Sequence, residues 1–287
     1  MALSTPPPTP SERKCQGVQL ERGAIGGAGR GQVLFLHVWK TAGSTLGEMA
    51  ITNGEAFHHH KTHEVLNWTQ VRAGKPSFVA YPGPMRPELE ASLWAGGGWK
   101  FVTMLRDPIE QAISLFLYKC HSTELGCKRE ALDPWVARGG RNKHWGKARD
   151  AGVWFVDNQA TRWICGAACD VDTLAEEHFR VATRHLFRFS AILITEDFDA
   201  LDKHRLGYML GWSKLASRTG SGEPLAGSFN SHHQHKRRLR KELLGDPRIR
   251  SRLAKVQRWD TALYQIARKL AEAQRLAHDA VACGAPS

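Results

Sequence analysis

A lysine, a glycine and three hydroxyl side chains lie close together in the segment His37-Val-Trp-Lys-Thr-Ala-Gly-Ser-Thr-Leu46. The segment follows a short apolar run and precedes a stretch with helical character. N–H groups at the start of a helix lack backbone partners, and the helix dipole favours negative charge there. Gly43 lets the backbone approach an anion, and Lys40 adds a mobile positive charge. The pattern predicts a phosphate-binding turn, with an ordinary strand–helix turn as the plainer alternative.

This turn does not have the order of residues found in a Walker A loop. That motif is GxxxxGK[ST], with the lysine after the glycines. Here Lys40 precedes Gly43, and no glycine opens the loop. A nucleotide-dependent kinase or ATPase of that type is therefore disfavoured.

A second candidate is Thr103-Met-Leu-Arg-Asp-Pro-Ile-Glu-Gln-Ala-Ile-Ser-Leu115. Arg106 follows an apolar run, at the strand end where open α/β sheets bind ligands. Ser114 comes two helical turns later, on the side that faces back toward that strand end. A guanidinium with a hydroxyl can hold a monophosphate, and Asp107 can cap the helix. Pairing of Arg106 with a carboxylate is the alternative.

Strands alternate with helices along the chain, which predicts a three-layer α/β fold with a mostly parallel sheet flanked by helices. We expect disordered residues 1–30 and one domain over 31–283. The expected strands are 32–38, 77–81, 100–105 and 191–195. The expected helices run to residue 49, over 87–94, from 108 to about 120, over 174–187 and from about 248 to 280. Residues 139–146 and 217–227 are expected to be exposed loops.

The composition is basic, with 40 Lys and Arg against 28 Asp and Glu and a formal net charge of +12. The charge favours anionic partners without choosing among them. None of the six cysteines forms a CxxC pair, so a zinc ribbon is not expected. The pairs Cys120/Cys127 and Cys165/Cys169 allow local disulfides or free thiols equally. No apolar run is long enough to span a membrane, so the chain is soluble as given or lacks an anchor.

Together the two segments resemble the cofactor-binding signatures of carbohydrate sulfotransferases, the family typified by heparan sulfate 2-O-sulfotransferases. That family binds the 5′-phosphosulfate of 3′-phosphoadenosine-5′-phosphosulfate (PAPS) with a loop like PKTGGTSL, similar to WKTAGSTL here, with Trp39 in the proline position. Its 3′-phosphate element, like LRDPxxRxxS, is similar to LRDPIEQAIS, with Gln111 in the second arginine position.

Three weaker similarities extend the resemblance over about residues 32 to 272. The stretch 157–166, DNQATRWICG, is similar to the family's NxQTRxLxG. The stretch 194–198, with Leu210-Gly-Trp212 after it, falls where the family has a comparable strand and helix. The stretch 259–264, WDTALY, resembles the family's closing DxxLYxxA helix.

The resemblance implies a P-loop-NTPase-like sulfotransferase fold and sulfuryl transfer from PAPS to an acceptor hydroxyl on a glycan, in the Golgi lumen or at its membrane. Lys40 would contact the 5′-phosphosulfate and its bridging oxygen, and Arg106 and Ser114 would hold the 3′-phosphate. The loop residues assigned to the 5′-phosphate are Thr41, Ala42, Gly43, Ser44 and Thr45. Sulfuryl transfer depends on positioning and charge stabilisation, so neither a metal ion nor a nucleic-acid partner is expected.

The general base is the point at which the chain departs from this family. A Gly-His pair commonly supplies it, and Tyr81-Pro-Gly-Pro84 stands at that place. Other sulfotransferases carry a base glutamate some twenty residues after the loop lysine, so we assign His63 or Glu64, with His58, His59 and His60 close by. A solvated polar loop is the alternative, and a metal site is disfavoured because three adjacent histidines cannot easily face one ion.

The densest basic stretch is His232-His-Gln-His-Lys-Arg-Arg-Leu-Arg-Lys241. Its charge has one sign, which favours contact with an acidic glycan or the nucleotide over a merely solvated run. A non-catalytic module that binds polyanions or nucleic acid is the competing function. It offers no reason for a lysine and an arginine at two strand ends.

Overall fold

The computed structural model describes residues 32–59, 71, 73–95, 98–120, 126–137, 157–215 and 231–282. Its five strands form one parallel sheet in the order β2-β3-β1-β4-β5. The strands are β1 (Gln32–Leu36), β2 (Phe57–His59), β3 (Phe78–Tyr81), β4 (Trp99–Leu105) and β5 (Ala191–Ile194). The expected α/β class with a parallel sheet is confirmed.

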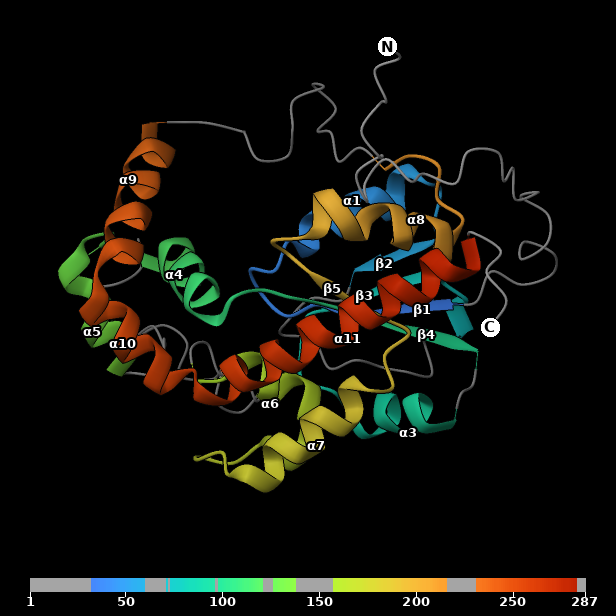
Figure 1. Ribbon diagram of the computed structural model, residues 1–287, viewed down its shortest axis with the longest axis horizontal. Helices are drawn as coiled ribbons and strands as arrows, with labels where there is room; N and C mark the ends of the chain where they lie inside the picture. The colour runs from blue at the N-terminus through green and yellow to red at the C-terminus, as the bar shows by residue number, and fades with distance from the viewer. Residues whose placement is uncertain are drawn as a thin grey trace, which may run out of the picture.

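Helices cover both faces of this sheet (Figure 1). The first helices are α1 (Gly43–Thr52), α3 (Pro87–Ala95), α4 (Pro108–Lys119), α5 (Leu132–Ala137), α6 (Gln159–Cys165) and α7 (Glu176–Leu186). The later ones are α8 (Lys203–Leu210), α9 (Ser231–Gly245), α10 (Pro247–Val256) and α11 (Arg258–Ala282). The short helical turns are η2 (Arg129–Ala131), η4 (Gly166–Cys169) and η5 (Phe198–Asp202).

The alternation of side chains along β1 separates two hydrophobic cores. Val33 and Phe35 pack with residues of α1 and α8. Leu34 and Leu36 point to the opposite face, where α3, α4, α6, α7 and α11 supply the core. A strand buried on both faces must be apolar throughout, which is why the run after Gln32 could be recognised in the sequence.

A group of helices lies beyond the carboxyl ends of the strands. In Figure 1 the chain leaves β4 and enters α4, on the left of the view, where α5, α9 and α10 also gather. α4 packs against both α9 and α10. This arrangement brings the basic helix α9 to the side of the sheet on which β1 and β4 end.

Two features differ from the expected elements. Residues 57–59 form the edge strand β2, which was not among the expected strands. The helix expected over 248–280 is two helices, because Gln257 leaves helical geometry between α10 and α11. The expectations for residues 1–30, 139–146 and 217–227 lie outside the described residues.

Among the helices of the described segments, none has both the length and the apolar character needed to cross a bilayer.

Candidate functional site

Lys40 and Arg106 lie at the point of the sheet where the chain reverses its direction of travel across the strands. β1 and β4 are parallel neighbours, and Lys40 follows the first while Arg106 follows the second. After β1 the chain proceeds to β2 and β3 on one side, whereas after β4 it proceeds to β5 on the other. Open α/β sheets bind ligands outside the carboxyl ends of strands at such a switch point. The topology therefore joins the two sequence motifs into one candidate site.

The loop between β1 and α1 is held in an unusual backbone conformation. Lys40 and Ala42 both have positive φ angles, 65° and 64°. A non-glycine residue in this region costs about 1–3 kcal/mol and persists only when its surroundings impose it. Strain of this kind accumulates at ligand-binding sites.

Three hydrogen bonds impose the loop conformation. The Thr41 hydroxyl donates to the carbonyl of Val38 over 2.7 Å. The carbonyl of Trp39 accepts from the Gln111 amide at 2.9 Å, and that of Lys40 accepts from Arg106 Nη1 at 3.3 Å. The Thr41 hydroxyl is therefore occupied within the loop.

The start of α1 has unpaired backbone donors. The first N–H to bond within the helix is that of Leu46, to the carbonyl of Ala42. The N-cap Ala42 has no side chain that could accept from the N–H groups of Gly43, Ser44 or Thr45. Within the described part of the chain these donors have no partner, so they can bind an anion.

Arg106 is held by carboxylates but retains a buried donor. Its Nη2 lies 2.8 Å from Glu110 Oε2, and its Nε lies 3.9 Å from Glu196 Oε1. That Nε is buried and makes no hydrogen bond within the described residues. Glu196 is itself anchored, since it accepts from the Asp107 N–H and the Tyr264 hydroxyl. The arginine is thus both oriented and left with capacity for another acceptor.

Lys40 lies among like charges. Burial lowers the pKa of Lys40 from its ordinary value, and the charges of Arg106, Lys236 and Lys119 lower it further. Its Nζ lies over the ring of Tyr118, 4.5 Å from the centroid. Lys40 makes no ion pair with a carboxylate in the described segments. A bound anion would raise the pKa of Lys40 again, so this cluster favours an anionic ligand.

Ser114 lies on α4 as the sequence predicts, one helical turn after Glu110 and on the same side of the helix. Arg106 precedes this helix and is joined to it by its ion pair with Glu110. Ser114 is half-buried. Asp107 begins this helix as predicted, accepting from the N–H groups of Ile109 and Glu110 at 3.0 Å each.

Several residues of the site were not identified from the sequence. They are Glu110, Tyr118, Lys119 and Glu196, and the bracing of the loop by Gln111 was not foreseen either. Glu110 could have been found from its i,i+4 spacing with Arg106. Glu196 comes from a distant part of the chain, and no local pattern announces it. Lys236 lies in the basic stretch 232–241, for which the sequence predicted contact with an anion without naming a single residue.

His63 and Glu64, the residues assigned as the base, lie outside the described residues, as do His60 and the side chain of His59. β2 runs parallel to β3 and ends at His59, so the chain leaves this strand on the same edge of the sheet as Lys40 and Arg106. His58 is exposed on β2. Tyr81 is buried, and burial raises the pKa of its hydroxyl, which opposes a role as base.

The stretches 157–166 and 259–264 are joined by hydrogen bonds in the structure. The Asn158 side chain accepts from the N–H groups of Trp259 and Asp260 and so caps α11. The Asp260 carboxylate accepts from the N–H groups of Ala160 and Thr161 and so caps α6. Each helix is capped by a side chain from the other, which fixes them together.

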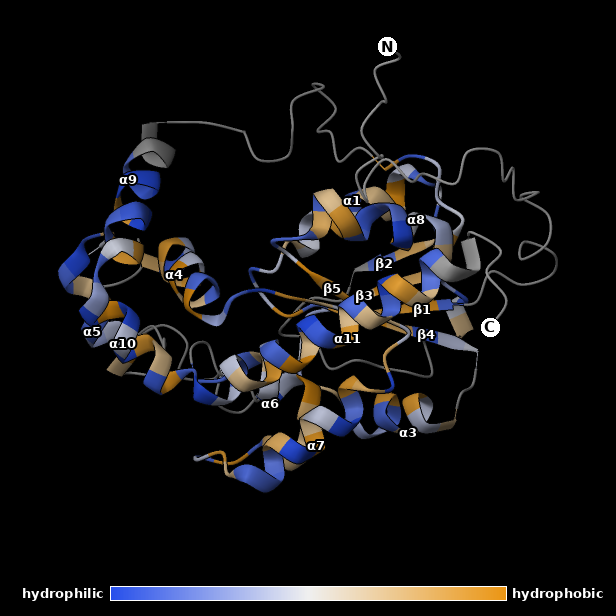
Figure 2. Cartoon of the chain, viewed as in Figure 1, coloured by the Kyte–Doolittle hydropathy of each residue, from blue (hydrophilic) through white to orange (hydrophobic). Residues whose placement is uncertain are grey.

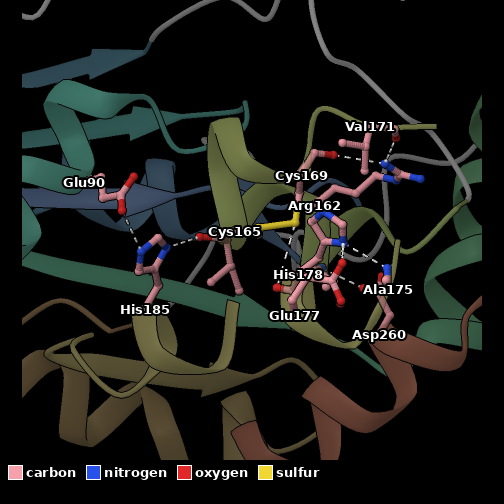
Figure 3. The surroundings of a disulfide bond; sticks show 12 residues. Glu90, Arg162, Cys165, Cys169, Val171, Ala175, Glu177, His178, His185 and Asp260 are labelled. Carbon is pink, nitrogen blue, oxygen red and sulfur yellow. Dashed lines mark hydrogen bonds and ion pairs between the residues drawn. A yellow bond between two sulfur atoms is a disulfide. The ribbon is translucent and has the colours of Figure 1, made fainter. Parts of the chain in front are cut away.

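Arg162 and a disulfide stabilise the turn after α6 (Figure 3). The buried guanidinium of Arg162 donates to the carbonyls of Cys169, Val171 and Asp172. Cys165 is bonded to Cys169, and Cys120 is bonded to Cys127. Of the two alternatives left open by the sequence, the structure has the disulfides. Arg162 therefore has a structural role in this turn.

No group of three or more His, Cys, Asp or Glu side chains is placed to hold a metal ion in the described segments. A comparison of the chain with models of known protein families finds no match, and a comparison with curated proteins finds no significantly similar sequence.

Proposed function

We propose that the chain is a sulfotransferase that transfers the sulfuryl group of PAPS to an acceptor hydroxyl on a carbohydrate. We assign it to the P-loop-NTPase-like sulfotransferase fold, close to the heparan sulfate 2-O-sulfotransferase family. One observation carries the proposal. The loop of Lys40 and the arginine after β4 meet at the switch point of a parallel sheet, joined by the bond from Arg106 to the Lys40 carbonyl.

The donors at this site fit the anionic groups of PAPS. Free N–H groups at the start of α1 suit the 5′-phosphate, because they combine unpaired donors with the positive end of the helix dipole. The buried Nε of Arg106 and the hydroxyl of Ser114 suit a second, separate phosphate. A guanidinium matches phosphate geometry better than an ammonium does.

PAPS would supply an activated sulfuryl group whose transfer leaves adenosine 3′,5′-bisphosphate. Lys40 neutralises the charge that grows on the leaving phosphate oxygen, which is a contribution made chiefly in the transition state. The lowered pKa of Lys40 makes its ammonium group a better proton donor. A bound phosphate raises this pKa again and so favours the charged form. A base, assigned to His63 or Glu64, takes the proton of the acceptor hydroxyl.

A glycan acceptor and a Golgi location belong to the same proposal. The two disulfides support an oxidising compartment, since disulfides rarely persist in the cytosol. The positive charge supports an acidic glycan among the acceptors.

The competing function is non-catalytic binding of a polyanion. The basic helix α9, which is strongly hydrophilic in Figure 2, favours it. Such a module would bind through charge alone, and its affinity would fall steeply with salt without regard to nucleotide structure.

Calorimetric titration with adenosine 3′,5′-bisphosphate and adenosine 5′-phosphate separates these functions. The sulfotransferase should bind the bisphosphate more tightly, and Arg106→Gln should remove most of that preference. A charged hydrogen bond contributes roughly 1.5–3 kcal/mol. Arg268→Gln, an exposed arginine on α11, is the matched control. Equal binding of both nucleotides by the wild type would contradict the proposed function.

A further inference from the structure

The 3′-phosphate element of the family that the chain resembles has two arginines, and Gln111 stands in the position of the second. The structure shows that Gln111 cannot serve as a ligand of the phosphate in its place. Gln111 is only 5% exposed. Its amide nitrogen donates to the Trp39 carbonyl at 2.9 Å and to Gln159 Oε1 at 3.0 Å. An amide nitrogen has two hydrogens, so both are occupied in bracing the loop. A second cationic donor must come from another element.

Arg240 of α9 is a cation that meets Arg106. Both guanidinium groups donate from Nη2 to the same atom, Oε2 of Glu110. Glu110 belongs to α4, and Arg240 is 130 positions further along the chain. The shared oxygen places the two guanidinium groups side by side, at the carboxyl end of β4.

One carboxylate cannot balance the charge collected around it. Burial raises the pKa of Glu110, but the hydrogen bonds and charges of Arg106 and Arg240 together outweigh burial and lower it. Lys236 lies one helical turn before Arg240, and its charge reaches Lys40. The carboxylate of Glu196 is a more distant counter-charge, with its Oε1 3.9 Å from Nε of Arg106. The excess positive charge and the unused Nε of Arg106 point to an anion that takes several donors at once.

α9 is fixed firmly enough to present Arg240 at a defined position. Leu239 and Leu243 are buried in the core shared with α4. Arg129 pairs with Glu242 of α9 and with Asp246, the cap of α10. Arg240 projects from the buried side of the helix and is half-exposed, whereas Arg238 is exposed on the opposite side. A preorganised guanidinium loses little freedom on binding.

We propose that Arg240 is the second arginine of the 3′-phosphate clamp, supplied by α9 in place of the residue at position 111. Glu110 acts as the internal counter-ion that holds both guanidinium groups in place until the phosphate binds. This assignment rests on the proposed function, because it gives the second phosphate of PAPS its remaining ligand. It also gives the basic helix α9 a specific role at the nucleotide, beyond attraction of an acidic glycan.

The test compares the ratio of the dissociation constants for adenosine 5′-phosphate and adenosine 3′,5′-bisphosphate in four proteins. These are the wild type, Arg240→Gln, Arg240→Lys and the control Arg238→Gln, which removes the same charge from the opposite face of α9. Losing a charged hydrogen bond should lower the ratio roughly 10- to 100-fold in Arg240→Gln. Arg240→Lys should recover part of it, and Arg238→Gln should retain it.

Each result has a distinct consequence. A wild type that prefers the bisphosphate, with an unchanged ratio in Arg240→Gln, would overturn the role of Arg240 and leave the proposed function standing. A wild type without the preference would overturn both. Equal losses in Arg240→Gln and Arg238→Gln would show a general charge effect and would also overturn the assignment. Because the ratio compares two ligands of one protein, a partial loss of folded protein cancels out of it.

Discussion

Gly43 illustrates how closely the end of β1 and the start of α1 approach each other. A Cβ atom added at this position would lie 2.0 Å from Nε2 of His37 and 2.1 Å from its Cδ2. The His37 ring is itself stacked on Phe35, with the centroids 5.4 Å apart. The imidazole of His37 therefore fills the space beside Gly43. This packing is a second reason for a glycine at position 43, besides the close approach of an anion.

Gly43→Ala should lower stability, because the methyl group and the imidazole cannot occupy the same volume. Overpacking a core costs about 1–3 kcal/mol. In a His37→Ala background the obstacle is gone, and alanine is favoured over glycine in a helix by up to about 1 kcal/mol. The same substitution should then be neutral or slightly stabilising.

Urea denaturation, followed by tryptophan fluorescence, measures the free energy of unfolding of the wild type, Gly43→Ala, His37→Ala and the double variant. Comparing the four values gives the coupling between positions 37 and 43. Gly245→Ala is the control, since a Cβ atom at Gly245 would have no neighbour within 4 Å. A cost of Gly43→Ala that is the same with and without His37 would refute the packing argument. The single variant should also bind adenosine 3′,5′-bisphosphate more weakly, because the N–H groups of α1 must shift.

Two further predictions concern titrating groups. Burial raises the pKa of Asp260 from 3.8 to about 6, so the folded state favours the protonated carboxyl. The contribution of Asp260 to the free energy of unfolding therefore falls by about 3 kcal/mol as pH rises from about 4 to 6. Urea denaturation gives the free energy of unfolding of the wild type and of Asp260→Asn. The difference between the two should shrink as pH rises over that interval, and a constant difference would contradict the raised pKa of Asp260. For the base, His63→Ala or Glu64→Gln should change the pH–rate profile of sulfuryl transfer, and a histidine base should give a wild-type rate that climbs between about pH 5.5 and 7.5. If both variants keep the full rate and the same profile, the base lies elsewhere, and His58 and His60 become the candidates to test.

The sequence predicted the elements that depend on local pattern. β1, β4 and β5 are apolar runs buried on both faces, and Asp107-Pro108 is a local signal for the start of α4. Lys40 and Arg106 could be brought together because parallel strands end at one edge of a sheet. Ser114 lies on the helix expected from residue 108, whereas α1 begins at Gly43, inside the stretch 41–44 that was interpreted as a turn.

The remaining features depend on partners that are distant in the sequence. β2 is an edge strand of three residues, and its Phe-His-His sequence lacks the apolar run of a central strand. The break at Gln257 has no glycine or proline, since it arises where Asn158 caps α11 from about one hundred positions away. The contact of Arg240 with Glu110 likewise joins two helices that no local pattern connects.

Transfer of labelled sulfate from PAPS to a panel of glycans tests the central claim most directly. The wild type should sulfate at least one acceptor, and Lys40→Ala should lose on the order of 10²–10³ in turnover, because it removes charge stabilisation from the transition state. Lys269→Ala, at an exposed lysine on α11, should keep the wild-type rate. Near-normal turnover in Lys40→Ala would contradict the assignment of the loop, and no transfer by a wild type that binds glycans would favour a polyanion-binding module.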